Sequence, residues 1–155
     1  MVKINFICHG NICRSPMAEF VMKDLVKKQG LKDKFIITSS ATSREEIGNP
    51  VHTGTKRKLY EQKIAVSSDK RAVQFEKSDY EKYDFLVVMD GNNERNLLRI
   101  IKSDPKNKVY KLLDFTKRKG DIADPWYTGN FDKTFEDIFE GCNGLLTYIL
   151  NNSIL

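Results

Sequence analysis

The apolar run at residues 85–89, Phe-Leu-Val-Val-Met, constrains the fold of this chain more than any other segment. It contains no polar residue, so a strand formed from it must be buried on both faces. Strands of this kind occupy the centre of parallel sheets whose two faces are covered by helices. Apolar runs at residues 2–7, 35–38 and 109–113 predict three further strands.

Apolar residues recur at helical spacing between these predicted strands. Pro16 suits the first turn of a helix, and Gly30 suits its end. A second helix is expected over residues 53–62, with Leu59 and Tyr60 facing inward. The segment at 40–53 is rich in Ser, Thr, Gly, Asn and Pro, which predicts a loop.

Two more helices are expected in the second half of the chain. Asn92 or Asn93 can cap a helix that carries Leu97, Leu98 and Ile101. The apolar stripe of the last helix comprises Phe131, Phe135, Ile138, Cys142, Leu145 and Ile149. Strands thus alternate with helices throughout, which predicts an α/β fold: an open parallel four-stranded sheet with helices on both faces, a flavodoxin-like three-layer arrangement. We expect a single domain over residues 1–155.

Length and composition narrow the functional classes. The chain has 155 residues and a net charge of +5. Its basic runs at 56–58 and 117–119 are short and lack interleaved aromatic residues, so we expect no nucleic-acid partner. No run of about 18 apolar residues is present, and the first apolar segment is too short for a signal peptide. We therefore expect a cytoplasmic protein without a membrane partner.

The three cysteines, Cys8, Cys13 and Cys142, do not suggest a disulfide framework, because their number is odd and small. Cys8 and Cys13 could form half of a zinc site, but no second Cys/His pair completes it. Cys142 lies on the apolar stripe of the last helix and is expected in the core. No metal and no cofactor is predicted.

The segment 8–15 has the composition of an oxyanion site between a strand and a helix. A short loop that leads into a helix directs free backbone N–H groups and the positive end of the helix dipole toward one point. Gly10 and Asn11 tolerate the positive φ that such a loop requires. Arg14 offers a planar fork for two phosphate oxygens. The same positive field favours a thiolate at Cys8, which would be an activated nucleophile.

Other interpretations of this segment remain open from the residues alone. A cysteine at a strand end is often a small buried hydrophobic residue, and a Cys-x5-Arg spacing also arises by chance. The rival phosphate-binding motif, G-x-x-x-x-G-K-[ST], does not occur in the chain. A binding module without catalysis would use the same loop, but it would not need Cys8, Arg14 and Asp124 together.

The segment CHGNICRSPMAE closely resembles the signature of the low-molecular-weight protein tyrosine phosphatases. A second motif, Asp124-Pro125-Trp126-Tyr127, is similar to the acid loop of that family. Ser39 after the second predicted strand and Asp90 after the third also fit the family's pattern. The resemblance covers nearly the whole chain, and its two motifs stand far apart in the expected order.

The resemblance implies a role for each of three residues. Cys8 attacks phosphorus and becomes a cysteinyl-phosphate, while Arg14 and the amides of residues 9–14 hold the equatorial oxygens. Asp124 protonates the leaving phenol and then activates water. The implied substrate is a phosphotyrosine-containing protein, with inorganic phosphate as product and other oxyanions as inhibitors. Metal independence and a monomeric state are expected with it.

Other residues acquire roles by the same resemblance. Ser15 assists departure of the Cys8 thiolate, and Asn11 and Ser39 support the loop. Trp126 and Tyr127 wall the cleft, although Tyr127 could instead be a core residue. The residues expected to contact substrate are His9, Gly10, Asn11, Ile12, Cys13, Ser15, Trp126 and Tyr127. Cys13 is a possible redox partner of the nucleophile, or simply a buried residue.

Some positions depart from the family's usual pattern. Many relatives carry an apolar residue where this chain has His9. Many eukaryotic relatives carry an aromatic residue where it has Glu45. The resemblance therefore implies that the edge of the substrate cleft is more polar in this chain than in those relatives. A thioredoxin-coupled arsenate reductase would need further cysteines downstream of the third predicted strand, and none lies between Cys13 and Cys142. A protein-arginine phosphatase would carry Thr in place of Ile12.

Overall fold

Four parallel strands form the sheet of the computed structural model, which describes residues 1–155. They are β1 (Val2–Cys8), β2 (Phe35–Ala41), β3 (Phe85–Val88) and β4 (Val109–Lys111). Their order across the sheet is β2-β1-β3-β4, and every pairing is parallel. The chain therefore moves outward from β1 to β2 and then crosses back to β3, so the loops after β1 and β3 flank the point where the direction of winding changes.

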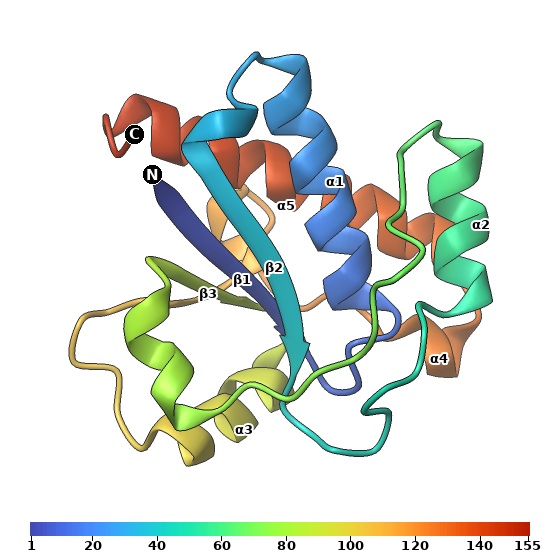
Figure 1. Cartoon of the computed structure of the whole chain (residues 1–155), viewed down its shortest axis with the longest axis horizontal. Helices are drawn as coiled ribbons and strands as arrows, with labels where there is room; N and C mark the ends of the chain where they lie inside the picture. Colours follow the sequence, from blue (N-terminus) through green and yellow to red (C-terminus); the bar gives the residue numbers. More distant parts are fainter.

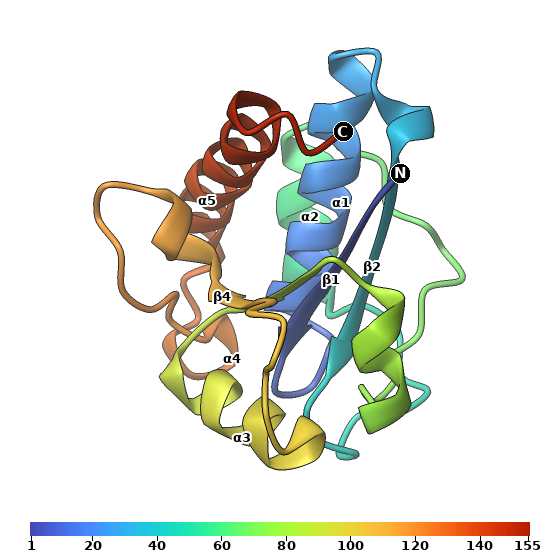
Figure 2. The same cartoon turned by 90° about the vertical axis from the view of Figure 1, so that its left-hand side faces the viewer.

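Helices cover both faces of this sheet (Figures 1 and 2). One face carries α1 (Arg14–Lys28) and α5 (Phe131–Asn151), with α2 (Thr53–Glu61) packed against both helices. The other face carries α3 (Gly91–Ile101) and the 3-10 helix η2 (Lys77–Lys82). The remaining short elements are η1 (Lys32–Lys34), η3 (Leu112–Phe115) and α4 (Pro125–Thr128). The three-layer α/β fold predicted from the sequence is confirmed.

Alternate side chains of the central strands belong to two separate cores, as the period of a strand requires. Ile4, Phe6 and Cys8 of β1 lie in the larger core of 27 buried residues under α1 and α5. Ile7 and Val88 lie in a smaller core of 7 residues under α3 and η2. Cys8 therefore ends β1 with its side chain on the face where α1 begins.

Two strand boundaries differ from the prediction by more than one residue. The fourth strand was expected to reach residue 113, but β4 ends at Lys111, and the buried Leu112 and Leu113 belong to η3. The 3-10 turn directs both leucines into the larger core, which explains the apolar run without a longer strand. The second strand extends to Ala41 rather than ending at residue 38, so Ser39 lies within β2.

Two helix predictions were wrong in detail. Tyr60 was expected to face inward, but it is 84% exposed. It follows the fully buried Leu59, and the next residue on a helix is rotated by about 100° from its neighbour. The cap of α3 is Asp90 rather than Asn92 or Asn93, since the Asp90 side chain accepts a hydrogen bond from the Asn93 amide.

Helix α5 packs tightly on η3 at two glycines, Gly141 and Gly144. A Cβ atom at Gly141 would collide with the Leu112 side chain, and one at Gly144 would collide with the Phe115 carbonyl. The two elements can approach this closely only without those side chains. None of the helices combines the length and apolar character needed to cross a bilayer.

Candidate active site

The loop between β1 and α1 is held from its outer side. The carbonyls that accept hydrogen bonds from surrounding groups belong to Cys8, His9, Ile12 and Cys13. Their donors include the Thr42, Ser43 and His52 amides and the Thr55 hydroxyl. A trans peptide directs its N–H opposite to its C=O, so the amides that follow these four carbonyls face the concave side. The loop therefore gathers several N–H groups around one point, next to the N-terminus of α1.

Asn11 connects this loop to three other parts of the chain. Its φ of 60° is left-handed, a region that Asn tolerates better than most residues. Its Nδ2 donates to Ser15 Oγ at 2.8 Å and to Ser39 Oγ at 3.0 Å. Its Oδ1 accepts from Lys70 Nζ at 3.0 Å and from the Val73 amide at 3.1 Å. With both ends of its amide bonded, the side chain fixes the loop's turn.

The Cys8 thiol is buried at the bottom of the loop. Its Sγ lies 3.0 Å from Ser15 Oγ and 3.3 Å from the Asn11 amide nitrogen. Both neighbours can donate a hydrogen bond to a sulfur anion. The surroundings of Cys8 therefore suit a thiolate that faces the centre of the loop.

Arg14 is only 2% exposed, and its guanidinium is oriented by three oxygen atoms. Its Nη1 donates to Asp90 Oδ2 at 2.7 Å and to the Ile122 carbonyl at 2.8 Å. Its Nη2 lies 3.4 Å from Asp124 Oδ2. Burial opposes the charge, but the negative charges of Cys8, Asp90 and Asp124 raise the pKa of Arg14 above its ordinary value. Asp90 thus holds one end of the fork, which leaves the other end for an oxyanion.

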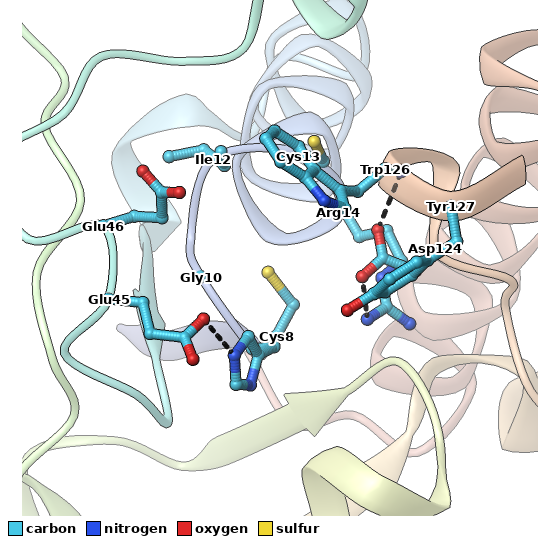
Figure 3. Close-up of a pocket in the computed structure, with 11 residues that line it drawn as sticks. Cys8, Gly10, Ile12, Cys13, Arg14, Glu45, Glu46, Asp124, Trp126 and Tyr127 are labelled. Atoms are coloured by element: carbon cyan, nitrogen blue, oxygen red, sulfur yellow. Dashed lines mark hydrogen bonds and ion pairs between the residues drawn. The ribbon is translucent and has the colours of Figure 1, made fainter. Parts of the chain in front are cut away.

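Asp124 caps α4, and its carboxyl group is directed toward Arg14. Its backbone is extended, as expected for a residue before proline. One side-chain oxygen, Oδ1, accepts from the Trp126 amide at 3.0 Å, while Oδ2 faces Arg14. The cap fixes the carboxyl group and leaves its second oxygen directed at the pocket (Figure 3).

Cys13 shares the pocket with Cys8 but differs in its electrostatics. Burial, followed by the negative charges of Cys8 and Asp124, raises the pKa of Cys13 to about 12. Cys13 is therefore a neutral thiol at physiological pH. Cys142 is buried in the larger core, as the sequence predicted.

The pocket encloses about 110 Å³. This is smaller than a typical drug-sized site, so it suits a compact anionic group whose remainder extends outside. We call the buried residues at its base the floor: Cys8, Asn11, Arg14, Ser15 and Ser39. The residues at its mouth form the rim: His9, Glu45, Glu46, Trp126 and Tyr127.

The rim has two chemically different sides (Figure 3). Glu45 and Glu46 lie on one side, and Glu45 Oε2 is 2.7 Å from His9 Nε2. Trp126 and Tyr127 lie on the other side and are 57% and 83% exposed, which excludes Tyr127 as a core residue. The structure thus brings residues of both motifs to one pocket, whereas Asn11 and Ser15, which were also expected to contact substrate, are buried and are not part of its lining.

Gly10 differs from the expectation, since its φ is not positive and only Asn11 takes the left-handed conformation within the loop. Gly10 instead leaves room for Glu46, whose Cγ would lie 3.2 Å from a Cβ atom at that position. A larger residue there would press on the rim.

Sequence reasoning missed three residues that hold the floor. Lys70 donates to Asn11 and to the Ser39 carbonyl, both at 3.0 Å, and burial lowers its pKa. Glu19 of α1 accepts from Ser39 Oγ at 2.6 Å. Asp90 matched the family pattern but had no assigned contact. A half-buried lysine 59 residues from its partner leaves no local pattern in a sequence.

An open parallel sheet that carries a Cys-x5-Arg loop at its carboxyl edge defines a class: α/β enzymes with a thiol inside a phosphate-binding loop. The family model of low molecular weight phosphotyrosine protein phosphatases matches residues 3–153. The protein-tyrosine-phosphatase PtpA of Staphylococcus epidermidis is 34% identical over all of this chain and 98% of its own length. YfkJ of Bacillus subtilis, also named a low molecular weight protein-tyrosine-phosphatase, is 36% identical over 96% of both chains.

Solved structures agree with these sequence matches. The crystal structure of YfkJ from Bacillus subtilis superposes with a TM-score of 0.94 at 35% identity, covering 98% of this chain and 96% of that one. SP-PTP of Streptococcus pyogenes gives 0.86 at 38% identity, covering 96% and 93%. The chain belongs to the low molecular weight phosphotyrosine protein phosphatase family. It is accordingly a protein-tyrosine-phosphatase, and its substrates are phosphoproteins.

Proposed function

We propose that this enzyme hydrolyses phosphotyrosine esters through a cysteinyl-phosphate intermediate, without a metal ion. One observation carries the proposal: Cys8, Arg14 and Asp124 line a single small pocket although they come from distant parts of the chain. A thiol, a fixed cation and a carboxyl group are the three components that a two-step phosphoryl transfer requires.

In the first step, the Cys8 thiolate attacks phosphorus and forms an S–P bond. The bond from phosphorus to the tyrosine oxygen breaks, and Asp124 gives its proton to that oxygen. Arg14 and the inward amides of the loop stabilise the charge on the three equatorial oxygens. Because Asp90 and the Ile122 carbonyl hold Nη1 of Arg14, its free edge needs no reorganisation during the reaction.

In the second step, water attacks phosphorus and Asp124 takes its proton. The S–P bond breaks, inorganic phosphate leaves, and Cys8 returns as a thiolate. Ser15 Oγ, 3.0 Å from Cys8 Sγ, supports this departure by donating to the sulfur anion. Asn11 and Ser39 act indirectly, because they position Ser15 and the turn of the loop.

Metal independence is supported by the positive field that the chain itself supplies. Arg14 and the loop amides occupy the position at which a metal would otherwise stabilise phosphate oxygens. The aromatic side chains of Trp126 and Tyr127 favour an aryl ester, since they can stack on the tyrosine ring outside the small pocket. The reaction needs neither a second subunit nor a nucleic acid.

The test is phosphate release from a phosphotyrosine peptide in EDTA at about pH 5.5–7. Cys8→Ser should abolish turnover, and rapid quenching of the native enzyme should trap one phosphate on Cys8, identified by mass spectrometry. Retained turnover in Cys8→Ser would refute the mechanism. Loss of turnover in EDTA that Mg²⁺ restores would refute metal independence.

A phosphoarginine peptide run alongside tests the competing substrate. Ile12 lines the pocket with an apolar side chain, which favours an aromatic ester over a guanidino phosphate. Turnover of phosphoarginine alone would assign the same residues to a different substrate. Phosphate binding without turnover of either peptide would instead indicate a binding module.

Cys13 has a restricted part in this scheme as a redox partner. It lies in the same pocket as Cys8, so a disulfide between them would protect an oxidised nucleophile. Burial disfavours the Cys13 thiolate, which is the species that attacks, while the charge of the Cys8 thiolate, a further cause of the raised pKa of Cys13, is absent once Cys8 is oxidised. We propose that Cys13 attacks a sulfenic acid formed on Cys8, so that an S–S bond forms and the sulfenic oxygen leaves as water.

A further inference from the structure

The rim of the pocket is acidic although the whole chain carries a net charge of +5. Of the side chains that line the pocket, the carboxylates are Glu45, Glu46 and Asp124, and the bases are His9 and Arg14. No lysine lines it. Arg44, the basic residue next to Glu45 in the sequence, is exposed and is not part of the lining.

The single permanent cation of the pocket does not offset this charge at the mouth. Arg14 lies at the base, where it is 2% exposed and paired with Asp90 at 2.7 Å and Asp124 at 3.4 Å. A bound phosphate would engage its remaining edge. The positive charge of Arg14 is therefore neutralised inside the pocket. The negative charges of Glu45 and Glu46 at the mouth have no comparable cation beside them.

The two glutamates are held in place on the same side of the mouth (Figure 3). Glu45 bonds to His9 at 2.7 Å, with its side chain 70% exposed. Glu46 Oε2 accepts from Asn49 Nδ2 at 2.5 Å, and its Cγ packs close to Gly10. His9 neutralises at most one of the two carboxylates, so the pair keeps a net negative charge. The opposite side is formed by the aromatic rings of Trp126 and Tyr127.

We propose that Glu45 and Glu46 make this enzyme select phosphotyrosine residues that have a lysine or arginine nearby in the substrate peptide. The inference rests on the proposed function and specifies its substrate class. The tyrosine ring stacks on the aromatic side, its phosphate occupies the floor, and a cationic side chain of the peptide meets the two carboxylates. An acidic peptide is disfavoured by the same charges.

An exposed ion pair changes an equilibrium by about 0.2–1 kcal/mol, which corresponds to roughly 1.4- to fivefold. Two carboxylates should therefore give a lysine-flanked peptide about two- to 25-fold higher kcat/KM than a glutamate-flanked one at low salt. Screening should reduce this ratio toward unity at about 1 M salt, where the Debye length falls to roughly 3 Å.

The experiment compares three phosphotyrosine peptides of equal length, with Lys, Ala or Glu on both sides of the phosphotyrosine. Native enzyme, Glu45→Gln, Glu46→Gln and the double variant are assayed on each peptide and on p-nitrophenyl phosphate. Asp33→Asn, at the opposite end of β2, serves as the control for loss of a remote carboxylate. The double variant should lose the Lys-over-Glu preference in kcat/KM after each peptide value is divided by the same protein's value for p-nitrophenyl phosphate, and Asp33→Asn should keep that preference.

Equal kcat/KM for the Lys and Glu peptides in the native enzyme would overturn the inference. A preference that persists in the double variant would overturn it too, because the selecting charge would then lie elsewhere. Peptide affinities measured with Cys8→Ser protein give a readout without turnover. Tighter binding of the Lys peptide together with absent hydrolysis by the native enzyme would reject the proposed function while upholding the acidic selection.

Discussion

The floor and the rim of one pocket are built in opposite ways. Every floor side chain is at least 95% buried, and each has a hydrogen-bond partner within the protein. The rim carries an exposed ion pair and two aromatic rings that are more than half exposed. A buried, fully bonded group holds one geometry, whereas an exposed side chain samples several rotamers. We therefore propose that the floor determines which reaction occurs and that the rim determines which substrate reaches it.

Asp124→Asn should give the largest effect among variants that retain Cys8, because it removes the proton donor while preserving the cap of α4. We expect kcat to fall by about 10²–10⁴-fold. The loss should be greater for phenyl phosphate than for p-nitrophenyl phosphate, whose leaving group needs less protonation. Steady-state kinetics on both esters measure this.

Asp121→Asn is the matched control, since it changes a carboxylate on the same loop that contacts Lys111 and Gly91 instead of the pocket. It should change kcat less than about twofold. An equal loss for both esters in Asp124→Asn would argue against a proton-donor role.

Asn11→Ala tests whether the floor depends on its hydrogen bonds. The change removes one hydrogen bond from Ser39 and one from Lys70, and it places Ala at a left-handed φ. We expect a loss of about 2–4 kcal/mol in the free energy of unfolding and about 10- to 100-fold in kcat/KM. Urea denaturation and kinetics measure the two effects.

Asn11→Gly separates the two causes, because glycine accepts the left-handed conformation but makes no side-chain bond. Activity in Asn11→Gly that equals the native level would show that the amide network is dispensable. Activity between the native and Asn11→Ala levels is expected.

Lys70→Met removes a half-buried cation that bonds to Asn11 of the floor but does not line the pocket. The loss of its bond to Asn11 should lower kcat/KM by roughly fivefold, about 1 kcal/mol, with little change in KM. Arg71→Met, which changes an exposed neighbour that bonds only backbone carbonyls, should leave kcat unchanged. Equal kinetics of the two variants would remove Lys70 from the group that holds the floor.

Tyr127→Ala should have the smallest effect, because it alters the rim alone. The loss of stacking should raise KM for a phosphotyrosine peptide by about two- to fivefold and leave kcat nearly constant. Tyr60→Ala, at an equally exposed position on α2, should change neither value. A drop in kcat without a rise in KM would place Tyr127 with the floor rather than the rim.

Much of the fold could be predicted because its signal is local. The run at 85–89 became the central strand β3, and the stripe of the last helix became the buried face of α5. Predictions failed where tertiary contacts decide between adjacent residues. Leu112 and Leu113 read as strand but form η3, and Tyr60 lies one residue beyond the buried side of its helix.

The residues of the site also fall into two groups, those that a local sequence pattern predicts and those that depend on tertiary contacts. The Cys-x5-Arg spacing and the Asp-Pro dipeptide are visible in the sequence, and the structure brings them together. Lys70 reaches the floor from a loop outside either motif. Glu19 ends the segment CHGNICRSPMAE, but the segment alone does not show that its side chain bonds to Ser39. Contacts of this kind depend on how segments pack, which no short window of sequence records.

The close packing of α5 on η3 has a consequence for engineering. The segment that carries Asp124 lies between these two elements in the chain, so we expect a change in their separation to shift Asp124 relative to Cys8. A methyl group at Gly144 would collide with the Phe115 carbonyl and push α5 and η3 apart. Catalytic rate could thus be tuned by a helix position that touches neither substrate nor pocket, through the distance between two backbones.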